Sequence, residues 1–105
     1  MSSSLGFIEY VCDNISDKYA VRYKKMFGDY MIYVNEKPVL LVCDNCVYVK
    51  MRDELRPLFA ESQVGIPYAG AKEHFVLDAD DVRLLNEAVD ILERITPLPK
   101  KKSRK

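Results

Sequence analysis

The chain has 105 residues, of which 49% are hydrophobic, and its 16 basic and 16 acidic side chains give a formal net charge of zero. This length predicts one domain with its own core and excludes two. No apolar run approaches the roughly 20 residues that cross a bilayer, and the N-terminus lacks the basic start and apolar stretch of a secretory signal. We therefore expect a cytoplasmic protein.

The charges are distributed unevenly along the chain. Residues 1–52 carry seven basic and six acidic side chains, residues 53–99 carry four and ten, and residues 100–105 carry five and none. This pattern predicts a single domain over residues 1–99 and a disordered basic tail over residues 100–105. An acidic C-terminal half is unsuited to binding phosphates, so we expect weak nucleic-acid binding or none.

A helix is predicted at the N-terminus, because apolar residues recur there at helical spacing behind two serines that are able to cap it. These residues are Leu5, Ile8, Val11, Cys12 and Ile15. Three strand-like runs follow, at residues 22–34, 38–43 and 46–51. The turns between them are too short for a crossover, so the three strands must be antiparallel neighbours.

The C-terminal half alternates between helix and strand. Residues 53–62 read as a short helix, residues 64–68 as a weak strand, and residues 72–77 as a further strand. The run at residues 78–95 has a regular apolar stripe and predicts a long helix that ends before Pro97. The predicted fold is α+β, with two layers, an antiparallel sheet and the order α-β-β-β-α-β-β-α.

Two-residue turns at Asn35-Glu36 and Asp44-Asn45 would set the register of the strands. The second turn places Leu41 opposite Tyr48, and the first places Ile32 opposite Val39. One face of the sheet then consists of Met31, Tyr33, Leu40, Val42, Val47, Val49 and Met51. The other consists of Tyr30, Ile32, Val39, Leu41, Cys43, Cys46, Tyr48 and Lys50.

Both faces of this predicted sheet are apolar, but the helices of a two-layer domain cover only one of them. The more aliphatic face is the expected core. An exposed apolar face on a small domain is typical of an interaction surface. We therefore predict an interface, and a homodimer, through Tyr30, Ile32, Val39, Leu41, Tyr48 and Lys50.

Cys43-Asp44-Asn45-Cys46 is a CxxC motif, for which zinc binding and redox chemistry are the functional interpretations. A closed zinc site needs four ligands, and only Cys12 and His74 would remain to complete it. A redox cysteine is favoured at a helix N-terminus, whereas these two lie on strands beside a turn. An ordinary hairpin with free thiols is the preferred interpretation, as expected in a reducing compartment.

The other candidate catalytic or metal-binding residues also have structural explanations. His74 is the single histidine, and no serine motif supplies it with a nucleophile. Asp78, Asp80 and Asp81 lack the glycine and spacing of a calcium loop, and helix capping explains them better. No glycine-rich motif for phosphates is present. We expect no enzyme activity, metal or cofactor, although a small metal or catalytic site stays open as a third alternative.

Seven tyrosines interleaved with basic residues favour a second function, in which single-stranded nucleic acid stacks on the sheet. The basic residues concerned are Arg22, Lys24, Lys25 and Lys50. The strand that contains them does not match the RNA-binding RNP1 pattern, and the acidic half opposes a basic channel. Nucleic-acid binding through the sheet face or the tail therefore stays as the alternative to protein binding.

Several segments together resemble the N-terminal domain of the bacterial TfoX/Sxy competence-regulator family. They are Lys25-Met26-Phe27-Gly28, the strand ending in Ile32-Tyr33-Val34, Leu41-Val42-Cys43-Asp44, Val47-Tyr48-Val49-Lys50 and Pro67-Tyr68-Ala69-Gly70-Ala71-Lys72. The resemblance extends from the first helix to Pro99. It implies an α/β domain similar to type III secretion chaperones.

This resemblance implies a regulatory, non-enzymatic role in transcription or competence, exerted through an unidentified protein partner. Longer family members carry a further helical domain, so we expect a stand-alone form of the N-terminal domain here. The resemblance assigns no active-site residues. Its motif residues of unknown role are Lys25, Met26, Phe27, Gly28, Tyr68, Gly70 and Lys72.

Overall fold

The computed structural model describes residues 4–26, 29–67 and 69–97. Its elements in chain order are α1 (Leu5–Asn14), β1 (Val21–Met26), β2 (Asp29–Val34), β3 (Lys37–Cys43), β4 (Cys46–Lys50), the 3-10 helix η1 (Asp53–Leu55), β5 (Val64–Gly65), β6 (His74–Leu77) and α2 (Val82–Ile95). The strands form one antiparallel sheet in the order β1-β2-β3-β4-β6-β5. The predicted α+β class with an antiparallel sheet is confirmed.

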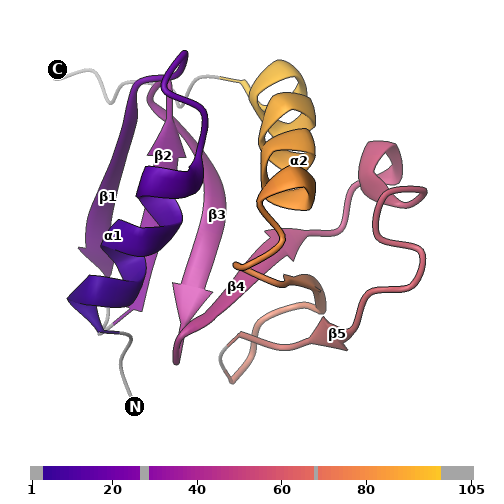
Figure 1. Cartoon of the computed structure of the whole chain (residues 1–105). Helices are drawn as coiled ribbons and strands as arrows, with labels where there is room; N and C mark the ends of the chain where they lie inside the picture. The colour runs from indigo at the N-terminus through magenta and orange to yellow at the C-terminus, as the bar shows by residue number, and fades with distance from the viewer. Residues whose placement is uncertain (1–3, 27–28, 68, 98–105) are drawn as a thin grey trace, which may run out of the picture.

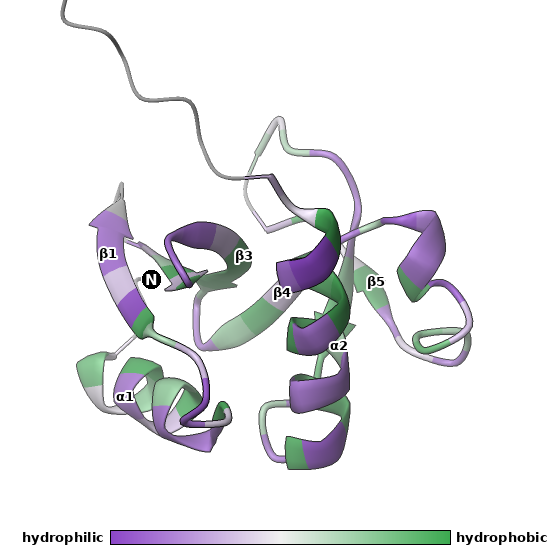
Figure 2. Cartoon of the chain, turned by 90° about the horizontal axis from the view of Figure 1, so that it is seen from above, coloured by the Kyte–Doolittle hydropathy of each residue, from purple (hydrophilic) through white to green (hydrophobic). Residues whose placement is uncertain are grey.

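Both α-helices lie on the same side of this sheet (Figures 1 and 2). The hydroxyl of Ser4 caps α1 by accepting a hydrogen bond from the amide of Phe7, and the carboxylate of Asp81 caps α2 by accepting one from the amide of Leu84. The apolar stripes of the two helices face the strands, and their buried members are Ile8, Val11, Leu85, Ala88, Val89 and Leu92.

The side chain of Asn86 joins the two helices. Its Oδ1 accepts a hydrogen bond from the amide of Ser16 at 2.7 Å, and its Nδ2 donates to the carbonyl of Asn14 at 2.9 Å. Two tyrosines add further links, since the hydroxyl of Tyr10 donates to Asp80 and that of Tyr19 donates to Asp90. The backbone groups at the C-terminal end of α1 therefore find hydrogen-bond partners on a residue of α2, near the other end of the chain.

The prediction of a single strand over residues 22–34 is wrong. Two strands occupy this segment, and they pair with each other from Val21 opposite Val34 to Met26 opposite Asp29. Lys25 before the reversal and Asp29 after it have low strand propensity, so the sequence does carry a weak signal against one continuous strand. Gly28 lies outside the described residues.

The prediction of a regular helix over residues 53–62 is only partly right. The structure has the 3-10 helix η1 followed by turns, and Pro57 lies just after η1, where its missing amide cannot extend a helix. Leu55 and Phe59 nevertheless anchor the segment in the core, where the ring of Phe59 stacks on Phe75 at a centroid distance of 5.0 Å. The weak strand is confirmed as the short β5.

The two predicted turns have the backbone that two-residue hairpins require. Asn35, Glu36, Asp44 and Asn45 have φ of 51°, 70°, 53° and 59°, which are the positive values of type I′ turns. The predicted register between β3 and β4 is confirmed, with Leu41 opposite Tyr48 and Cys43 opposite Cys46. This hairpin therefore forms as its sequence predicts.

The predicted register between β2 and β3 is wrong beyond the turn. Ile32 lies opposite Leu40, and Tyr33 lies opposite Pro38, so Val39 is an additional residue that forms a bulge. Because side chains alternate along a strand, this shift of one residue exchanges the two faces of β2. Tyr30 and Ile32 join the core, and Met31 and Tyr33 lie on the opposite face.

Candidate interaction face of the sheet

The open face is defined here as the sheet face that points away from α1 and α2. A row of paired residues crosses five strands on this face, because Lys24 pairs with Met31, Met31 with Leu41, Leu41 with Tyr48, and Tyr48 with Val76. Met31, Leu41, Tyr48 and Val76 are all half-buried. We call these four side chains the apolar row.

Polar and cationic groups surround the apolar row. The guanidinium of Arg22 bonds to the carboxylate of Glu36 at 2.9–3.2 Å and lies 4.4 Å from the centroid of the Tyr33 ring. This hydrogen bonding lowers the pKa of the Glu36 carboxyl group. Lys24 and Lys50 are exposed beside the row. The open face thus has an apolar centre and a polar rim, which is the composition of protein interfaces.

The structure places the six predicted surface residues on two different faces. Leu41, Tyr48 and Lys50 lie on the open face. The other three are core residues, with exposures of 9% for Tyr30, 0% for Ile32 and 6% for Val39. The bulge at Val39 explains this difference, because it reverses the alternation of β2 relative to β3.

Sequence reasoning missed several residues of the open face, among them Met31, Tyr33 and Val76. The same register error assigns Met31 and Tyr33 to the core. Val76 lies on β6, which pairs with β4 on the side opposite to β3. Alternation along residues 74–77 was the signal that places Val76 on the open face, since Phe75 and Leu77 are buried and the residues that alternate with them are half-buried.

The family-motif residues of unknown role are spread over separate elements in the described part of the chain. Lys25 is exposed on β1, Gly70 has the positive φ of 89° that suits glycine, and the carbonyl of Lys72 lies 2.8 Å from Nδ1 of His74. Met26 ends β1. Phe27, Gly28 and Tyr68 lie outside the described residues.

The three cysteines differ in exposure and ionisation. Cys43 is buried, and this burial, together with the nearby carboxylate of Asp29, raises the pKa of its thiol to about 12. Cys12 is half-buried, and desolvation raises its pKa to about 11. Cys46 is exposed. A raised pKa disfavours the thiolate, which is the form that redox chemistry and metal binding use.

The remaining candidate residues are found in structural roles. His74 is half-buried, and its ring meets that of Tyr48 edge to face at 6.5 Å between centroids. The predicted capping role is confirmed for Asp81, and Asp78 accepts a hydrogen bond from the amide of Asp80. Within residues 4–26, 29–67 and 69–97, no three His, Cys, Asp or Glu side chains are grouped as metal ligands.

The TfoX N-terminal domain family matches residues 13–88. An uncharacterized 12.7 kDa protein encoded in the trpE 5′ region of Spirochaeta aurantia is 37% identical over 107 aligned positions, which cover 100% of this chain and 91% of that protein. No solved structure matches. Neither helix described is long and apolar enough to span a membrane. The family match covers more than half of the sequence, so this chain belongs to the TfoX N-terminal domain family.

Proposed function

We propose that this chain is a cytoplasmic, non-enzymatic regulatory module of transcription or competence that acts by binding protein through the open face of its sheet. Membership of the TfoX N-terminal domain family supports a regulatory role. The observation that carries the proposal is the apolar row, which crosses β2, β3, β4 and β6 on the face that the helices leave uncovered.

The occupant proposed for this face is a second copy of the chain. The row runs perpendicular to the strands near the middle of the sheet, so a two-fold axis through Leu41 and Tyr48 would bring each row against its counterpart. Complete burial of an exposed aliphatic or aromatic side chain contributes about 1.5–3 kcal/mol, and half-buried side chains contribute less. The polar rim must therefore take part in the contact.

The oligomeric state in solution tests this proposal. Analytical ultracentrifugation should show a dimer for the parent chain and a folded monomer for Leu41→Lys, because the new ammonium group would be desolvated at the centre of the contact. Leu5→Lys is the matched control, since Leu5 is 49% exposed at the start of α1, on the other side of the sheet. A parent chain that stays monomeric at high concentration contradicts the dimer.

Binding of single-stranded nucleic acid to the same face is a separate candidate, favoured by one observation. Lys24 on the edge strand β1, and Lys50 and Tyr48 on β4, lie on the same open face, whereas α1 and α2 lie on the other side of the sheet and carry several acidic residues. Oligonucleotide binding at low salt that is lost in Tyr48→Ala would support this candidate. Binding that is lost only when residues 100–105 are removed would assign it to the tail.

A further inference from the structure

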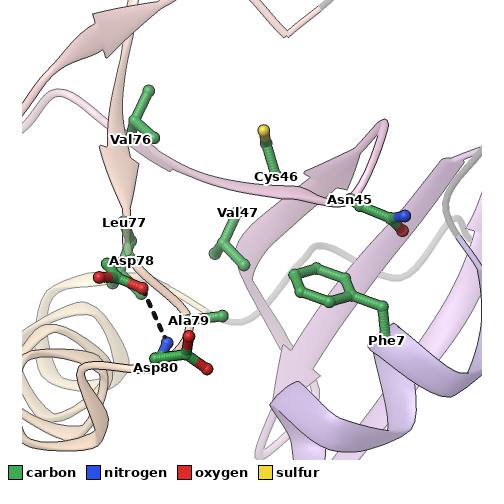
Figure 3. A pocket seen from close by; sticks show the side chains of 9 residues that line it. All are labelled: Phe7, Asn45, Cys46, Val47, Val76, Leu77, Asp78, Ala79 and Asp80. Carbon is green, nitrogen blue, oxygen red and sulfur yellow. Dashed lines mark hydrogen bonds between the residues drawn. The ribbon is translucent and has the colours of Figure 1, made fainter.

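A cavity of about 310 Å³ opens at one end of the sheet (Figure 3). It lies where the first turn of α1, the turn between β3 and β4, and the connection from β6 to α2 meet. The side chains that line it are Phe7, Asn45, Cys46, Val47, Val76, Leu77, Asp78, Ala79 and Asp80. Its volume is at the lower end of the range for small-molecule sites.

The inner part of the cavity is apolar. Val47, Leu77 and Ala79 are buried core residues with exposures of 1%, 2% and 8%, and the half-buried ring of Phe7 forms the wall opposite them. The backbone of Phe7 is held at the start of α1, because its amide donates to the capping hydroxyl of Ser4. The main-chain amide of Ser4 in turn donates to Asn45 on the other side of the cavity at 2.9 Å. These links hold the walls in place before a ligand arrives.

Both charged side chains that line the cavity are carboxylates. Oδ1 of Asp78 accepts a hydrogen bond from the amide of Asp80, and Oδ1 of Asp80 accepts one from the hydroxyl of Tyr10 at 2.6 Å. These bonds orient both groups but neutralise neither. Among the ion pairs of the described residues, none includes Asp78 or Asp80. The cavity thus combines an apolar interior with uncompensated negative charge at its rim.

We propose that this cavity binds a small molecule with an apolar body and a primary ammonium group. The apolar body would lie against Phe7 and Val47, and the ammonium group would donate hydrogen bonds to the carboxylates of Asp78 and Asp80. Such charge-assisted bonds are stronger beside an apolar surface than in open water. The cavity borders the apolar row at Val76, but the residues proposed to contact the ligand, Phe7, Val47, Asp78 and Asp80, lie outside the row.

Phenethylamine is the cationic probe, with phenethyl alcohol as its neutral analogue and 3-phenylpropionate as its anionic analogue. In amide NMR spectra of the full chain, phenethylamine should shift Phe7, Val47 and Leu77 together. The alcohol should bind about tenfold more weakly, because it lacks the charge that strengthens the hydrogen bonds, and the carboxylate should not bind. Equal affinity of the amine and the alcohol, or shifts spread over the whole surface, would overturn the proposal.

Two isosteric variants locate the charge that matters. Asp78→Asn keeps an oxygen that accepts from the amide of Asp80 but removes the charge, and it should weaken phenethylamine binding about tenfold. Asp44→Asn is the matched control, since Asp44 is exposed in the neighbouring turn, does not line the cavity, and has a positive φ that asparagine tolerates. An equal loss in both variants would mean general electrostatic attraction and would overturn the site. The three-probe comparison on the parent chain decides the proposal even if Asp78→Asn fails to fold.

Discussion

The ring of Tyr48 lies against Gly65, so that a Cβ built on Gly65 would stand 3.2 Å from Cε1 of Tyr48 and 3.3 Å from Cγ2 of Val76. These distances are shorter than ordinary contacts between carbon atoms. The absence of a side chain at Gly65 therefore allows the short strand β5 to lie beside the apolar row. This contact joins the far edge of the sheet to its centre.

Substitution of Gly65 by valine should consequently destabilise the fold by about 1–3 kcal/mol, because the added methyl groups overpack against Tyr48 and Val76. Urea unfolding followed by circular dichroism measures the change in the free energy of unfolding. Gly6→Ala is the control with the opposite sign, since nothing lies within 4 Å of its Cβ and alanine stabilises a helix by about 0.5–1 kcal/mol relative to glycine. A stable Gly65→Val variant would show that the Tyr48 ring moves freely.

A pair of alanine variants tests the register of β2. Ile32 is 0% exposed, so Ile32→Ala should cost about 2–5 kcal/mol of the free energy of unfolding through the cavity it leaves. Met31 is its neighbour on the open face and is half-buried, so Met31→Ala should cost less than about 1 kcal/mol. Chemical denaturation of the two variants under identical conditions gives the comparison. The reverse order of costs would mean that the bulge at Val39 is absent.

The hydrogen bond from Tyr19 to Asp90 makes the free energy of unfolding depend on pH in the alkaline range. This bond, aided by desolvation, raises the pKa of the Tyr19 hydroxyl from 10.0 to about 12. A phenol whose pKa is higher in the folded state stabilises that state fully below about pH 10 and loses this contribution as the pH rises through about 12. Tyr19→Phe should cost about 1 kcal/mol at neutral pH, since the bond is partly exposed.

The difference in unfolding free energy between the parent and Tyr19→Phe should therefore shrink between about pH 10 and pH 12. Urea unfolding across this range measures it, and tyrosinate absorbance shows which hydroxyl titrates late. A difference that stays constant with pH would mean that the Tyr19 hydroxyl ionises equally in the folded and unfolded states.

Alkylation by iodoacetamide should distinguish the three thiols by their environment. Cys46 is exposed and should react first, whereas a pKa of about 12 leaves roughly one part in ten thousand of Cys43 as thiolate near pH 8. Cys12, with a pKa of about 11, should also react slowly. Peptide mass spectrometry after timed quenching gives the order. Fast modification of Cys43 in the folded chain would show that this part of the sheet opens readily.

The sequence was sufficient for elements whose signals are local. The periodicity of Leu5, Ile8 and Val11 predicted α1, and the residues at 35–36 and 44–45 predicted two turns that the structure confirms by their positive φ. The register of the hairpin formed by β3 and β4 followed from its turn alone. Such features depend on neighbouring residues, so a single sequence contains the information that fixes them.

The elements that sequence reasoning missed depend on contacts between distant residues. No local signal shows that Val39 is the additional residue, because Val39, Leu40 and Leu41 are chemically alike and any of them is able to form the bulge. The bulge falls at Val39 because core packing buries Ile32 opposite Leu40. In the cavity, Phe7 comes together with Asp78 and Asp80, which follow it in the chain by about 70 residues. Its composition was therefore not visible in the sequence.

Asn86 has a consequence for the order in which the molecule opens. Since its side-chain amide satisfies a carbonyl and an amide at the end of α1, this end has its hydrogen-bond partners only while α2 is docked. The first and last helices should therefore be lost together as one cooperative unit in native-state hydrogen exchange, although more than 60 residues separate them. During synthesis, α1 emerges early yet acquires its final protection only after α2 has been made.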